Sequence, residues 1–128
     1  MPARLLAATT IAALAVAAPA SAKTVTVTAA DRGDTVRAEQ GDTIRVSLAA
    51  NQTTPFKWAV TKRPAAGVAR LVGQRYVSPA DAPPGAPGRQ LYEIRATGAG
   101  TTAFRAAYRP LSGGRAAQRF GISIRVRG

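Results

Sequence analysis

Hydrophobic and polar residues alternate with a period of two along most of the chain after Lys23. Ile44, Val46 and Leu48 alternate with polar or small residues, and the same rhythm recurs near the C-terminus. Such alternation places one face of a strand in a core and the other in water. No segment after residue 22 sustains a helical period. The pattern predicts about eight short strands, at 24–28, 35–38, 43–48, 56–61, 68–78, 92–96, 104–109 and 120–127.

Turn-forming residues separate these segments at intervals of about eight to twelve residues. The clearest turns are Gly33-Asp34, Gly41-Asp42, Gly98-Ala99-Gly100 and Gly113-Gly114. Short strands with regularly spaced turns are typical of an antiparallel β-sandwich. Because no internal repeat or linker divides the chain, we expect one all-β domain of about seven or eight strands.

The first 22 residues have the pattern of an export signal. Arg4 supplies a positive charge, residues 5–18 carry none, and Ala20-Ser21-Ala22 forms a cleavage site of small residues. The uncharged run is shorter than the roughly 20 residues that span a bilayer. We therefore expect cleavage after Ala22, which leaves a domain at 23–128 that is periplasmic or secreted and has no membrane attachment.

The composition excludes most enzymatic chemistry. The 128 residues include no Cys and no His, which removes catalytic triads, thiolate nucleophiles and the usual zinc ligands. Asp31 and Asp34 are close enough in sequence for a carboxylate pair or a calcium site, but turn capping explains them more simply. We expect no enzyme, no cofactor and no metal; an acid pair assembled by the fold is the one enzymatic alternative.

A strong positive charge raises a second functional hypothesis. Eighteen Lys and Arg residues against six Asp and Glu residues give a formal net charge of +12. Such an excess can bind nucleic acid or another polyanion. The arginines recur mostly at polar positions of strands without interleaved aromatic residues, which favours a solvated face and no nucleic-acid partner. These arginines are Arg37, Arg45, Arg95, Arg105, Arg125 and Arg127.

The segment from Asn51 to Trp58 carries the most informative motif. Its sequence, Asn51-Gln52-Thr53-Thr54-Pro55-Phe56-Lys57-Trp58, resembles the Asn-Pro-Thr-Thr-Gly-Tyr/Phe-x-Trp motif of the chagasin family. Members of this family are small inhibitors of papain-like cysteine proteases. Gln52 and Pro55 depart from the family's Pro and Gly, and Pro55 holds its own φ near −65° and restricts Thr54 to extended conformations.

Three further segments resemble family motifs in the expected order. Pro83-Pro84-Gly85-Ala86-Pro87-Gly88 is similar to the Gly-rich middle loop, and Gly98-Ala99-Gly100-Thr101-Thr102 to the Gly-x-Gly/Ala-x-Thr motif. Tyr108-Arg109-Pro110-Leu111 is similar to the Arg-Pro-Trp motif, with Leu111 in place of Trp. The resemblance implies an immunoglobulin-like sandwich that acts as a monomeric, reversible inhibitor, with three loops at one end occluding the protease cleft.

The resemblance also implies which residues bind the protease, with Thr53 and Thr54 nearest its nucleophile. The implied contact residues are Asn51, Gln52, Thr53, Thr54, Pro55, Phe56, Gly85, Gly88, Arg109, Pro110 and Leu111. Trp58 is in phase with Phe56 and Val60, which predicts a core position. Asn51 is expected to order the loop by bonding neighbouring backbone groups. The alternative function is an exported binding or adaptor module that recognises a protein or a polyanion through its basic surface.

Overall fold

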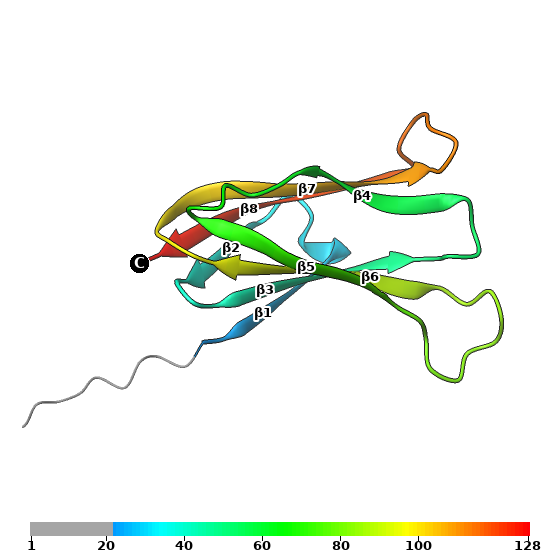
Figure 1. The fold of residues 1–128 in the computed structure, drawn as a ribbon, viewed down its shortest axis with the longest axis horizontal. Coiled ribbons are helices and arrows are strands. Elements are labelled where there is room, and N and C mark those ends of the chain that lie inside the picture. The colour runs from blue at the N-terminus through cyan, green and yellow to red at the C-terminus, as the bar shows by residue number, and fades with distance from the viewer. Residues whose placement is uncertain (1–21) are drawn as a thin grey trace, which may run out of the picture.

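The computed structural model describes residues 22–128, which form two four-stranded sheets packed as a sandwich (Figure 1). One sheet has the strand order β1-β3-β6-β5 and the other β2-β8-β7-β4. The strands are β1 (Thr24–Thr28), β2 (Thr35–Glu39), β3 (Thr43–Ala50), β4 (Phe56–Lys62), β5 (Ala69–Val77), β6 (Gly88–Ala96), β7 (Gly100–Pro110) and β8 (Gln118–Arg127). This arrangement confirms the predicted all-β sandwich.

One short 3-10 turn, η1 (Ala29–Asp31), carries the chain from β1 in the first sheet to β2 in the second. Within residues 22–128, no helix is long and apolar enough to cross a lipid bilayer. The predicted export leader lies outside the described residues, except for Ala22.

Strand direction differs between the centre and one edge of each sheet. β3–β6, β5–β6, β4–β7 and β7–β8 pair antiparallel, whereas β1–β3 and β2–β8 pair in parallel. Alternation identifies the buried face of a strand but not the direction of its neighbour, so the sequence did not predict the parallel edges. Three predicted strands also begin earlier than expected. β6 extends to Gly88, β7 to Gly100 and β8 to Gln118, through pairing with Ala50, Val126 and Tyr108.

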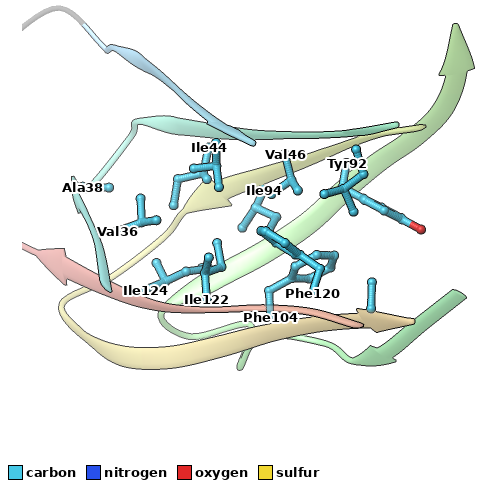
Figure 2. Packing of buried hydrophobic residues seen from close by; sticks show 14 of the residues in the cluster. Val36, Ala38, Ile44, Val46, Tyr92, Ile94, Phe104, Phe120, Ile122 and Ile124 are labelled. Carbon is cyan, nitrogen blue, oxygen red and sulfur yellow. The ribbon is translucent and has the colours of Figure 1, made fainter. Parts of the chain in front are cut away.

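The core lies between the sheets and is built from the alternating apolar positions (Figure 2). Tyr92 from β6 packs on Phe104 from β7, with ring centroids 5.2 Å apart, and Phe104 lies 6.4 Å from Phe120 in β8. Full burial of a large apolar side chain contributes about 1.5 to 3 kcal/mol. Burial also raises the pKa of Tyr92 to about 12, so this phenol is neutral throughout the physiological range.

Three loops meet at one end of the sandwich, away from the C-terminus (Figure 1). β3 ends where β6 begins, with Ala50 opposite Gly88, and β4 begins where β7 ends, with Phe56 opposite Pro110. Loops 51–55, 78–87 and 111–117 are attached directly to these strand ends. Strand register therefore brings together three of the four motif segments, whereas Gly98-Ala99-Gly100-Thr101-Thr102 lies at the other end of β7.

Candidate functional site

Asn51 organises loop 51–55 from within. Its Oδ1 atom accepts hydrogen bonds from the Thr53 backbone N–H at 3.0 Å and from the Thr53 hydroxyl at 2.6 Å. The Thr54 N–H and hydroxyl both donate to the Asn51 carbonyl oxygen, at 3.2 Å and 2.7 Å. These bonds close a tight turn and confirm the prediction that Asn51 orders the loop.

An aromatic support lies beneath this turn. The Tyr108 hydroxyl accepts the Asn51 backbone N–H at 3.2 Å and lies 3.3 Å from the Thr54 hydroxyl. Its ring packs against Phe56 and Trp58, at centroid distances of 5.5 Å and 5.1 Å. We define Phe56, Trp58 and Tyr108 as the aromatic support. Because Tyr108 is in phase with inward-facing residues of β7, the sequence marked it as a strand residue and gave no signal for its role under the loop.

Trp58 anchors the base of the same loop. Its side chain is 5% exposed, which confirms the predicted core position. The indole N–H donates to the Ala49 carbonyl oxygen at 2.9 Å, so β4 and the end of β3 are joined by a side chain as well as by the loop itself. A buried indole N–H usually finds such a partner.

Hydrogen bonds also link loop 51–55 to the loop on each side of it. The Asn51 Nδ2 atom donates to the Gly85 carbonyl oxygen at 3.0 Å. The Leu111 backbone N–H donates to the Pro55 carbonyl oxygen at 2.7 Å. The three loops therefore form one connected surface, which we call the loop edge, and loop 51–55 lies at its centre.

The loop edge exposes both apolar and small polar groups. Leu111 is 70% exposed, and with Gln52 and Phe56 it lines a shallow hollow of about 290 Å³. Thr53 is exposed, whereas Thr54 is half-buried, and its hydroxyl is used inside the loop. Of the two threonines expected to contact a partner, Thr53 is the one that faces outward.

The other predicted contact residues divide by exposure. Gln52, Pro55, Gly85 and Arg109 are exposed, and Asn51, Phe56 and Pro110 are half-buried. Gly88 differs from the expectation, because it is buried in β6. A Cβ atom there would lie 2.3 Å from the Val77 carbonyl oxygen, so Gly88 serves the close approach of β5 and has no surface for a partner.

Two of the acidic residues hold turns, Asp31 as predicted and Asp42 as well. The Asp31 carboxylate accepts the Thr28 N–H at 2.9 Å, and Asp42 accepts the Glu39 N–H at 2.9 Å. Among residues 22–128, no group of three or more acidic, His or Cys side chains is placed to hold a metal ion.

The sheet β2-β8-β7-β4 carries many exposed cations. Several lie directly opposite one another in the register, as Arg37 does with Arg125 and Lys62 with Arg105. Like charges in these positions repel, which costs stability. The exposed cations of this sheet are Arg37, Lys57, Lys62, Arg105, Arg109, Arg119, Arg125 and Arg127. Four of the six arginines predicted to be solvated are among them, and Arg95 is exposed on the other sheet. Arg45 differs, because it is half-buried and paired with Glu93 at 3.0 Å.

The comparison with protein families shows which family the chain belongs to. The family described as Chagasin family peptidase inhibitor I42 matches residues 37–124. The chain belongs to this family. Membership confirms the sequence-based identification of an inhibitor and not an enzyme. The motifs at 51–58, 83–88, 98–102 and 108–111 all lie within the matched residues.

Solved structures share the fold. The cysteine protease inhibitor EhICP2 from Entamoeba histolytica aligns with a TM-score of 0.70 at 19% identity, covering 84% of this chain and 99% of that one. The solution structure of Amebosin gives 0.66 at 21% identity, covering 84% and 100%. PbICP-C, determined in complex with falcipain-2, gives 0.50 at 16% identity, covering 85% and 93%. No curated protein matches the sequence significantly.

Proposed function

We propose that this chagasin-family inhibitor blocks papain-like cysteine proteases by placing the loop edge across the active-site cleft. The observation that carries the proposal is the position of loop 51–55, which is bonded to Gly85 on one side and to Leu111 on the other. A surface whose loops are already fixed to one another loses little conformational entropy when it binds.

Loop 51–55 is suited to occupy a protease without being cleaved. Proteases cut segments that lie extended through the cleft, whereas the bond from the Thr54 N–H to the Asn51 carbonyl holds this segment in a turn. Thr53 would lie nearest the protease nucleophile, and Gly85, Arg109 and Leu111 would contact the cleft walls. The chain would act by exclusion of substrate and would supply no reacting group.

A titration tests this proposal. Purified protein is added in increasing amounts to papain, to a cathepsin of the papain type and to trypsin. We expect stoichiometric loss of activity for the two cysteine proteases and none for trypsin. Equal inhibition of trypsin, or no effect on papain, would contradict the proposal.

One substitution tests the placement of the loop. Thr53→Arg adds a long charged side chain at the centre of the loop edge and removes the hydroxyl bond to Asn51; it should abolish inhibition while the domain stays folded. Thr101→Arg makes the same change at an exposed position on β7 at the far end of the sandwich, and should leave inhibition unchanged. Unchanged inhibition by Thr53→Arg would show that the loop is not in the cleft.

We also propose that the protein works outside the cytoplasm, in the periplasm or after secretion. The support is the pattern of the first 22 residues, with Arg4 before an uncharged run and a cleavage site of small residues at Ala20-Ser21-Ala22. Expression of the full chain in a bacterial host, followed by fractionation, tests this location. Recovery of the uncleaved chain in the cytoplasm would contradict it.

A further inference from the structure

The carboxylate of Asp42 makes one contact that turn capping does not explain. Its Oδ2 atom accepts the Glu39 N–H three residues away, as capping requires, but its Oδ1 atom accepts the backbone N–H of Lys23 at 2.9 Å. Asp42 is only 6% exposed, and it is one of two buried polar residues among those described, together with Ser47. The buried carboxylate thus reaches the residue that precedes β1.

Lys23 is held in this position from its other side. Its carbonyl oxygen accepts the Thr43 N–H at 2.8 Å, and the parallel pairing of β1 with β3 begins at the next residue, where Thr24 lies opposite Thr43. The nitrogen of Lys23 is therefore fixed against Asp42, while Ala22 before it is exposed and outside the strand.

We propose that the Ala22–Lys23 bond is a maturation site and that Asp42 is the receptor for the N-terminal ammonium group that its cleavage creates. The inference rests on the proposed export of the protein. In the step, water is added across the peptide bond by a processing endopeptidase: Ala22 keeps the carbonyl carbon as a carboxylate, and Lys23 gains an α-amino group. That group takes up a proton at neutral pH.

Cleavage changes the chemistry of the contact without moving its atoms. Before it, Asp42 accepts a neutral amide N–H; after it, the same nitrogen is a cation with three N–H donors. The bond before cleavage already has a charged acceptor, and cleavage adds a charged donor, so the contact becomes an ion pair. Asp42 is already charged before cleavage, because the N–H groups of Lys23 and Glu39 hold its pKa below the ordinary value of 3.8.

Other charges surround the pair and set its pH dependence. A hollow of about 550 Å³ next to it is lined by Lys23, Arg37, Glu39, Arg125 and Arg127, and Arg95 lies opposite Thr43. An α-amino group has an ordinary pKa of roughly 7.7 to 8.0. The arginines lower this pKa and the carboxylate raises it; because the carboxylate is in direct contact, its effect is the larger one in the folded state. The added stability is therefore complete below about pH 7.7 and is lost as the pH rises through the folded value.

Two chains that differ only at the N-terminus test the receptor. One begins at Lys23, and the other retains Ala20-Ser21-Ala22, which moves its terminal amine roughly 10 Å further along an extended chain. Both contain all eight strands and every residue of the core cluster. At pH 6 we expect the chain that begins at Lys23 to melt about 4 °C higher. Equal melting temperatures would overturn the receptor role.

The difference should vanish where the new amine is neutral, at about pH 10.5, and in the pair of chains carrying Asp42→Asn. If Asp42→Asn does not fold, the pH comparison of the unsubstituted chains decides alone. A difference that persists at high pH would contradict the ion pair.

N-terminal sequencing of the exported full chain tests the cleavage separately. Lys23 as the first residue supports the maturation site, and any other first residue refutes it. Both chains should inhibit papain equally, because the Asp42 contact lies at the opposite end of β3 from the loop edge. Failure of this inference is thereby distinguished from failure of the proposed inhibition.

Discussion

Loops 51–55 and 78–87 are neighbours in the loop edge, but they are ordered by different means. Loop 51–55 connects the two sheets and is held by hydrogen bonds to the Asn51 side chain and by the aromatic support. Loop 78–87 returns within one sheet, and its internal backbone bond runs from the Ala86 N–H to the Pro83 carbonyl oxygen at 3.2 Å. Its sequence instead contains Pro79, Pro83, Pro84 and Pro87.

The two loops should respond differently to mutation. A hydrogen-bonded loop depends on particular partners, so one substitution can release several contacts. A proline-rich loop carries its restraint in its own backbone, because each ring fixes one φ angle, and a substitution removes one restraint at a time. Loop 78–87 also turns through positive φ at Asp81 and Gly85, at 53° and 86°.

Removing the anchor under loop 51–55 should have the largest effect. Trp58→Ala leaves a cavity beneath Tyr108 and an unpaired Ala49 carbonyl, and should lower the free energy of unfolding by about 3 to 5 kcal/mol. Chemical denaturation measures this loss. Trp58→Phe is the matched control, since it keeps most of the volume and should lose less. A stability of Trp58→Ala close to that of the parent would mean that the side chain is not a core anchor.

Removing the internal organiser of loop 51–55 should mainly affect inhibition. Asn51→Ala removes the acceptor for Thr53 and the donor to Gly85, and should weaken inhibition of papain about 10- to 100-fold, as the loss of two or three hydrogen bonds implies. Inhibition constants measure it. Asn51→Asp retains the acceptor but loses the donor, and should fall in between. Equal constants for Asn51→Ala and the parent would show that the loop is ordered without this side chain.

A proline substitution in loop 78–87 should affect inhibition less than the substitution of Asn51 does. Pro84→Ala frees one backbone angle and should cost about 0.4 to 1 kcal/mol in stability, mostly through the unfolded chain. Inhibition should weaken less than about threefold, the equivalent of 0.6 kcal/mol. Thermal melting and inhibition assays on the same sample measure both. A loss as large as that of Asn51→Ala would contradict the difference between the loops.

The smallest effect is expected from salt, because loops 51–55 and 78–87 contain one charged residue, Asp81, and Arg109 is the one cation among the proposed protease contacts. Raising the ionic strength from about 50 to 200 mM should slow association with papain modestly and barely change dissociation. If the natural partner is a polyanion that contacts six or more of the exposed cations, affinity should instead fall roughly a thousandfold over this range. The double substitution Arg105→Ser and Arg125→Ser would weaken binding of the polyanion and leave inhibition of papain unchanged.

Sequence reasoning recovered the elements whose signal is local. Alternation marks the buried face of each strand, so the core and the position of Trp58 followed directly. The bonds from Thr53 to the Asn51 side chain are local and were expected, whereas the bond from Asn51 to Gly85, 34 residues away, was not. The parallel edge strands and the role of Tyr108 were not predictable in this way. Tyr108 meets Asn51 only because of strand register over 57 residues of sequence, and Gly88 is buried because β5 crosses closely beside it.

The bond between the Trp58 indole and Ala49 makes the protein its own optical probe. The chain has a single Trp, so all indole fluorescence arises at the base of loop 51–55. Its emission reports the polarity around one buried ring without any attached dye. Binding that tightens the loop, or a substitution that lets water reach the ring, would shift the emission in opposite directions.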